Sequence, residues 1–272
     1  MQLYEINQVS KLSKKTLRGI SFIILLYDGR HTSSLGLRIY LSVYIKSQIT
    51  MKDAQLVMNN SATGKVGYWS TLLSVIFGFG YSIPQILSTL KIIPHPQDLF
   101  WLFLPSLFLA PAFLVAMICL DFSVNSTLKI WTTIGWAFAA IYCTMVSLVY
   151  FSQLAVVLPQ QFKGVADDKN LLLFESGTFL MSVDCLGYFF MSLSSFFAAF
   201  AFANSKHKWL YRGLLLNGSL MPLLVLAFFY PVFYYIGAVW MITFPLAMIN
   251  AIKFFRDDLQ TVVKLNIAYE NK

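Results

Sequence analysis

Charged residues are scarce in this sequence. Only 12% of its 272 residues are Asp, Glu, Lys or Arg, whereas about a quarter is usual for a soluble globular protein. Hydrophobic residues make up 58% of the chain, which holds 25 Phe and 14 Tyr. This composition excludes a soluble fold. It predicts a protein that faces lipid, with aromatic side chains anchoring it at the depth of the lipid headgroups.

Motifs of catalysis and metal binding are also missing. The sequence has no His-Glu-x-x-His, no Gly-x-Ser-x-Gly and no phosphate-binding loop. Its three histidines are widely separated, at His31, His95 and His207. They fall in different segments outside the apolar runs and are not expected to meet on one metal ion. We therefore predict no metal and no cofactor, and an enzyme is the least favoured class of function.

Few cysteines are present, and all three lie inside apolar runs: Cys119, Cys143 and Cys185. We expect them to be small buried hydrophobic side chains rather than disulfide partners. A signal peptide is not expected either, because the short apolar run 20–27 is flanked by charge and no small-residue cleavage site follows it.

Six apolar stretches are long enough to cross the hydrocarbon core of a bilayer, which takes about 20 helical residues. They are approximately 67–90, 98–120, 130–158, 177–203, 213–230 and 232–252. Helices are expected because a segment in lipid must satisfy its own backbone hydrogen bonds, and period-two alternation is absent from these runs. The predicted fold is all-α, a polytopic membrane bundle of six transmembrane helices.

The orientation follows from the basic residues, since cytoplasmic loops carry an excess of Lys and Arg. With the N-terminus inside, 17 of the 20 Lys and Arg residues fall on the cytoplasmic side and three on the other. Both termini are therefore predicted to be cytoplasmic. The net charge of +8 reflects this orientation; a nucleic-acid partner is not expected, because no basic helix carries interleaved aromatic residues.

The predicted organisation is a basic cytoplasmic tail at 1–66, the bundle at 67–252 and a C-terminal cytoplasmic tail at 253–272. Between Leu35 and Ile45 apolar residues alternate as in a β-strand, with no second strand to pair with. Because Met51 resembles a natural start, residues 1–50 are interpreted as a start-site extension or a disordered tail. The alternative is a membrane-surface segment held against anionic lipid by its basic residues, at about 1 kcal/mol each.

Asp184 is the one acidic residue well inside a predicted span. A charged side chain there costs about 2.5 to 3.5 kcal/mol, so it should face protein or water and have a partner. Counted along the helices at 1.5 Å per residue, Asp184 lies about 10 Å below the outer boundary. Gln85 and Gln153 reach nearly the same depth. Three tyrosines accompany them, at Tyr81, Tyr150 and Tyr188. We predict that these six residues form a polar ligand-binding cluster in the outer third of the bundle.

The competing interpretation is that these polar side chains only pack helices together, at about 0.6 kcal/mol each. It is favoured more strongly for Asn217 and Asn250, near the inner ends of the last two spans. Prolines and glycines inside the spans are weak support for a cavity, because both are common in membrane helices.

Two segments carry a resemblance to known proteins. They are Tyr150-Phe151-Ser152-Gln153, running on to Val157-Leu158-Pro159, and Asp184-Cys185-Leu186-Gly187-Tyr188-Phe189-Phe190-Met191. Here the chain resembles uncharacterised multi-pass inner-membrane proteins of bacteria, grouped as a domain of unknown function. The resemblance covers about residues 65–252. It implies a six-helix bundle in a bacterial inner membrane and implies no activity.

Two main function hypotheses follow. The first is a membrane protein that binds or moves a small solute or a lipid through the polar cluster, as a transporter or an accessory subunit. The second is a structural or interaction protein without a substrate, and a membrane enzyme comes third. The bilayer is the expected partner, and Lys206, Lys208 and Arg212 are expected to contact anionic lipid headgroups.

Overall fold

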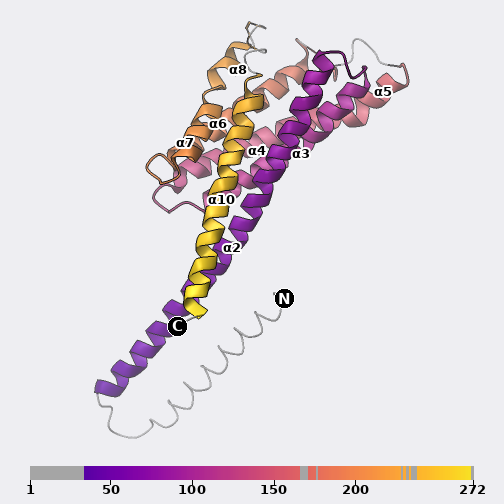
Figure 1. Ribbon diagram of the computed structural model, residues 1–272. Coiled ribbons are helices and arrows are strands. Elements are labelled where there is room, and N and C mark those ends of the chain that lie inside the picture. The colour runs from indigo at the N-terminus through magenta and orange to yellow at the C-terminus, as the bar shows by residue number, and fades with distance from the viewer. Residues whose placement is uncertain are drawn as a thin grey trace. The chain divides into compact units, whose positions relative to one another are not determined.

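The computed structural model describes the backbone of residues 34–165, 171–175, 177–227, 229–230, 233 and 238–270, and side chains within residues 62–261 of these ranges except those of 221, 224 and 227. The chain divides into two units, Met1–Gln55 and Leu56–Lys272. Residues 1–33, which make up most of the predicted extension, lie outside the described residues. Helices and no strands are found in the described part of the chain (Figure 1). Their bounds are α2 Ser34–Thr89, α3 Gln97–Phe122, α4 Lys129–Ser152, the π-helical turn η1 Gln153–Val157, α5 Leu158–Phe162, α6 Phe179–Phe200, α7 Lys208–Gly218, α8 Met221–Ala227 and α10 Trp240–Glu270.

The strand-like alternation between Leu35 and Ile45 is a helix in the structure, because α2 begins at Ser34. The alternation is therefore not the sign of a strand. A lone strand leaves its backbone donors and acceptors without partners, whereas a helix bonds them within the segment. Local alternation of apolar residues could not outweigh that requirement.

Four helices are long and apolar enough to cross a membrane: Ala62–Thr89, Gln97–Phe122, Lys129–Phe162 and Phe179–Phe200. They coincide with the first four predicted spans to within a few residues. The all-helical class is therefore confirmed, and the chain has the character of a membrane protein. The third helix passes from α4 through η1 into α5 without a break in helical structure.

The fifth predicted span differs from the structure. In place of one helix over 213–230, α7 ends at Gly218 and α8 begins at Met221. Pro222 explains the interruption, since it lacks the backbone N–H that a continuous helix would direct to the carbonyl of Gly218. The last helix starts at Trp240 instead of residue 232 and continues to Glu270.

The core of the Leu56–Lys272 unit lies where α3, α4, α6 and α10 meet. Phe113 of α3 is fully buried, and its ring packs edge-on against Tyr142 of α4 and Phe244 of α10, at centroid distances of 5.8 and 5.6 Å. In Figure 1, α3, α4 and α6 run side by side, and α10 runs beside α2. One aromatic cluster therefore ties three helices together.

Helix α2 has an apolar outer face and an inner face of small residues. Trp69, Ile76 and Ile83 recur every seven residues and are more than half exposed, as expected of side chains that face lipid. Small residues recur every four positions on the buried face: Ser70, Ser74, Gly78 and Ser82. The serine hydroxyls bond to carbonyls of their own helix, so close packing of α2 leaves none of these three hydroxyls unsatisfied.

Close packing at Gly218 generates a test of the fold. A Cβ atom there would come within 2.6 Å of the backbone N and Cα of Phe196, whereas a Cβ at Gly78 would meet its nearest atom, on Phe244, at 3.5 Å. Gly218→Ala is expected to destabilise the protein by about 1 to 3 kcal/mol, because backbone cannot yield as a side chain can. Gly78→Ala, the matched control, should be neutral or stabilising. Thermal unfolding of the purified protein in lipid nanodiscs measures both, and equal midpoints would contradict this packing.

Candidate functional site: a cavity at Asp184

A cavity of about 660 Å³ opens at the end of the bundle where α2 ends and α6 begins. Its walls come from α2, α3, α4 and α6, from residues just before α6, and from the start of α10. The polar residues that line it are Tyr81, Gln85, Ser88, Thr89, Asp98, Tyr150, Glu175, Asp184 and Tyr188. The volume lies within the range of small-molecule sites in proteins, about 300 to 1,000 Å³.

Asp184 lies on the inner wall of this cavity. Helix α6 starts after Thr178, whose hydroxyl accepts a hydrogen bond from the backbone N–H of Met181, and this cap places Asp184 in the second turn. Its side chain is buried, at 6% exposure. The Tyr150 hydroxyl interacts with the carboxyl, whose Oδ1 atom has no hydrogen-bond partner among the described residues. Asp184 thus lines the cavity with one carboxyl oxygen that no described group satisfies.

Two hydroxyl contacts surround the carboxyl. The hydroxyls of Tyr150 and Tyr188 lie 3.0 Å apart and join α4 to α6. On α2, the Tyr81 hydroxyl donates to Oε1 of Gln85 at 2.9 Å, which is the expected contact between residues four apart on a helix. Tyr81, Gln85, Tyr150 and Tyr188 thus line the same cavity as Asp184.

Gln153 does not line this cavity. Its side chain is buried, and its amide nitrogen donates to the backbone carbonyl of Leu172 at 2.5 Å. The π-helical turn η1 begins at Gln153; such turns add a residue to the helix and rotate the side chains that follow. The sequence analysis grouped Gln153 with Asp184 by depth, and depth carries no information about rotation around the helix.

Five of the six predicted residues are therefore brought together, and Gln153 instead ties α4 to the segment before α6. The two glutamines bond elsewhere, Gln85 to Tyr81 and Gln153 to Leu172, and the Tyr150 hydroxyl is a protein group that interacts with Asp184. That these residues bind a ligand stays a prediction.

The mouth of the cavity carries two further acidic residues that the sequence analysis did not single out. Asp98, near the start of α3, is 7% exposed, accepts a hydrogen bond from the Ser88 hydroxyl at 2.6 Å, and lies 3.2 Å from Nδ1 of His95. Glu175 is exposed. In the part of the chain that the structure describes, no Lys, Arg or His lines the cavity.

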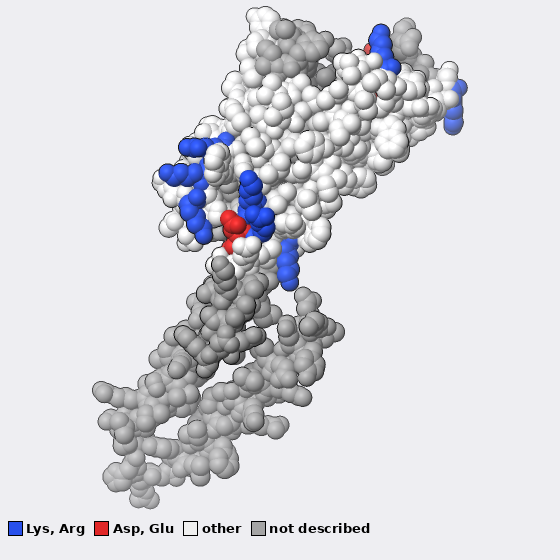
Figure 2. Space-filling model, in the orientation of Figure 1, with Lys and Arg blue, Asp and Glu red and all other residues white. Residues whose placement is uncertain are grey.

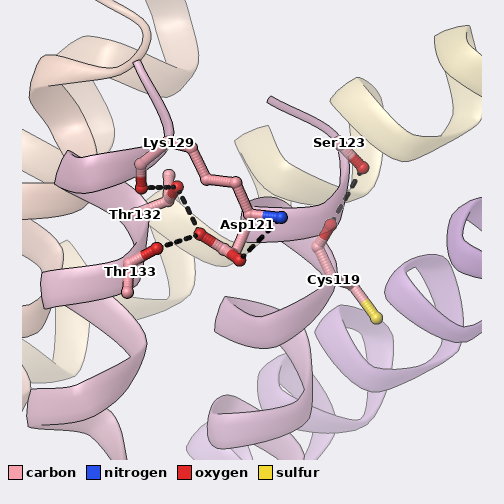
Figure 3. A network of polar contacts seen from close by, with 6 residues as sticks. All are labelled: Cys119, Asp121, Ser123, Lys129, Thr132 and Thr133. Carbon is pink, nitrogen blue, oxygen red and sulfur yellow. Dashed lines mark hydrogen bonds and ion pairs between the residues drawn. The ribbon is translucent and has the colours of Figure 1, made fainter. Parts of the chain in front are cut away.

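The opposite end of the bundle holds a polar network that sequence analysis missed (Figure 3). Asp121, at the end of α3, is 5% exposed and accepts hydrogen bonds at its Oδ1 atom from Thr132 and Thr133, at 2.8 and 2.9 Å. Its Oδ2 atom lies 3.6 Å from Nζ of Lys129. An Asp just after one apolar run and a Lys with two Thr at the start of the next was the available signal. Both carboxyl oxygens are satisfied, so this network closes a helical hairpin.

The two asparagines behave as packing residues. Asn217 of α7 donates to Oγ of Ser195 and accepts from Thr243, while Asn250 donates to the carbonyl of Trp209. These contacts join α6, α7 and α10. They agree with the interpretation that the sequence favoured for both residues.

On the face shown in Figure 2, Lys and Arg side chains are concentrated at the end of the Leu56–Lys272 unit that holds the Asp121 network. A smaller cavity of about 290 Å³ lies there between His207 and Asp257, and Arg212 stacks 5.6 Å from the Trp209 ring. Partial burial and the charge of Lys206 lower the pKa of His207, so it is mainly neutral at pH 7. No group of three His, Cys, Asp or Glu residues suited to a metal ion occurs in the described part of the chain.

Loss of the Gln153 bond provides a test of how the cavity is walled. Gln153→Leu keeps the volume of the side chain but removes the donor to Leu172. We expect faster backbone hydrogen exchange in residues 171–175, with little change in α4, because this bond holds the segment against the bundle. Ser152→Ala is the control, since the Ser152 hydroxyl bonds only within its own helix, to the Leu148 carbonyl. Exchange rates equal in both variants would show that the bond has no such role.

Comparison with known proteins gives no further assignment: no protein-family model, no curated protein and no solved structure matches this chain.

Proposed function

We propose that the protein is a multi-pass membrane protein that binds a small solute in the cavity at Asp184. The observation that carries the proposal is Asp184, a buried residue that lines a cavity of about 660 Å³ and whose Oδ1 atom lacks a hydrogen-bond partner among the described residues. A carboxyl so placed is costly in a membrane helix. A bound solute would remove part of that cost.

The rival function is a structural protein whose polar residues serve only to pack helices. The Asp121 and Asn217 networks show what such packing looks like in this chain, because their polar atoms meet protein partners. Asp184 differs in that respect. Two buried hydroxyls, of Tyr142 and Ser194, also lack partners, but they are neutral and neither is among the residues that line the cavity.

The proposed topology has six crossings, with α7 and α8 together forming the fifth and the first part of α10 the sixth. Both termini are cytoplasmic, which puts the basic end of the bundle inside and the mouth of the cavity outside. The distribution of Lys and Arg supports this orientation.

A bacterial inner membrane is the proposed location, supported by the resemblance at 150–159 and 184–191. Lys206, Lys208 and Arg212 are all exposed and are proposed to contact anionic lipid headgroups.

Reporter fusions test the topology. A reporter after Lys272 should be active only in its cytoplasmic form, and one inserted within 163–170 only in its external form. The reason is that this topology puts 17 of the 20 Lys and Arg residues on the cytoplasmic side, where membrane proteins carry their excess of basic residues. The same form active at both positions would contradict the topology.

Labelling of an engineered thiol tests the cavity. In a variant whose three cysteines are replaced by alanine, Met181→Cys places a thiol on the cavity wall, and Leu148→Cys places one on a side chain that is 61% exposed on the outer face of α4. A charged, membrane-impermeant thiosulfonate should label residue 181 from outside and leave residue 148 unlabelled. Thiolates form in water and are suppressed in lipid. Absence of labelling at 181 would mean that the cavity is closed to solutes.

A further inference from the structure

We infer that the solute is an organic cation, an amine or quaternary ammonium with a compact apolar substituent. This inference rests on the proposed function and names the chemical class that the same cavity would take. It is drawn from the charge of the lining, from the aromatic rings in the wall and from the size of the space.

The charge of the lining has one sign. Three carboxyl groups line the cavity, those of Asp98, Glu175 and Asp184, and no Lys, Arg or His is among the described residues that line it. An anion would therefore meet like charge without a compensating cation. A neutral apolar molecule would leave Oδ1 of Asp184 unpartnered, which keeps its desolvation cost in place. A cation offers Asp184 the partner that the protein does not supply.

Asp184 is distinct from the other two acids. Asp98 is already engaged by Ser88 and His95 at the mouth, and Glu175 is exposed to solvent. Asp184 is as buried as Asp98, but its Oδ1 atom has no hydrogen-bond partner among the described residues. The two outer acids would attract a cation toward the mouth, and Asp184 would hold it.

Aromatic rings supply the rest of the wall in two groups. In the first, the Trp240 ring lies 5.4 Å from Tyr81 and 4.9 Å from Tyr188. In the second, the Phe103 ring lies 5.6 Å from Tyr150 and 5.3 Å from Phe174. All six rings belong to residues that line the cavity. A cation within about 6 Å of such a ring is attracted to its face, and several rings around one site are a known way to bind quaternary ammonium groups.

The space is too large and too apolar for an inorganic ion. Sodium or calcium requires a close shell of several oxygen ligands, and no cluster of acidic, His or Cys residues suited to a metal occurs in the described part of the chain. Beyond the polar groups, Ile86, Leu99, Leu102, Ala238 and Met241 line the cavity. These side chains would cover an apolar substituent on the ammonium group.

Binding of benzyltrimethylammonium is the test. The full chain, purified into nanodiscs of neutral phosphatidylcholine, is titrated by calorimetry with this cation, with benzyl alcohol and with benzenesulfonate, which share its ring and differ in charge. We expect binding of the cation alone. Equal or tighter binding of the neutral or the anionic compound would overturn the inference.

Two pairs of variants locate the binding. Asp184→Asn should weaken binding of the cation about thirtyfold or more, in line with loss of one partner of a buried charge pair, whereas Asp121→Asn changes an acid in the distant hairpin network and should leave binding unchanged. Trp240→Leu should weaken it several-fold, and Trp131→Leu, whose ring packs on Phe197 and Phe200, should not. If Asp184→Asn does not fold, the comparison of Trp240→Leu with Trp131→Leu tests the inference. Binding unchanged in both Asp184→Asn and Trp240→Leu would refute the inference.

The labelling reaction at Met181→Cys separates the two proposals. Protection of that thiol by benzyltrimethylammonium supports both. Protection only by benzyl alcohol or benzenesulfonate would support a solute-binding cavity and contradict the inference that the solute is a cation. If the thiol is not labelled at all, both the proposed solute-binding cavity and the inferred cation are contradicted.

Discussion

Within a bilayer, every polar group that leaves water needs a partner supplied by the protein itself, and the arrangement of this chain depends on that requirement. Serine hydroxyls of α2 bond to their own helix, Asp121 is met by two threonines and a lysine, and Asn217 links Ser195 to Thr243. These contacts let the helices pack closely. The functional account rests on Asp184, which has the one unsatisfied buried carboxyl oxygen among the described residues.

The two ends of the bundle meet this requirement in different ways. At the basic end, acids and amides bridge neighbouring helices and are satisfied, so the helices close on one another around Phe255 and Phe254. At the other end, α2, α3, α6 and α10 are held apart by large aromatic rings, which line a cavity. Of these rings Tyr150 interacts with the Asp184 carboxyl, and the Oδ1 atom is left without a hydrogen-bond partner among the described residues. The fold thus produces a closed end and an open end from the same few helices.

Much of this arrangement could be predicted from the sequence. Apolar runs located the first four long helices to within a few residues, because lipid demands continuous helices of about that length. Depth counted along the helices brought Asp184, Gln85 and three tyrosines together correctly. Rotation could not be predicted: the π-helical turn at Gln153 turns its side chain to Leu172. Nor could the break before Pro222, since hydropathy records the apolar run and not the missing backbone donor. The Asp121 network was not predicted because Asp121 lies just past the end of an apolar run.

The central claim is that the Asp184 carboxyl faces an accessible cavity, with Tyr150 as its protein partner. An experimental structure of the full chain in lipid nanodiscs tests it most directly. The account predicts Asp184 on the cavity wall, its carboxyl in contact with the Tyr150 hydroxyl and Oδ1 directed into a space that holds water or a bound solute. An Asp184 side chain that points into lipid, or one whose two oxygens are both bonded to protein groups in a closed interior, would contradict the account.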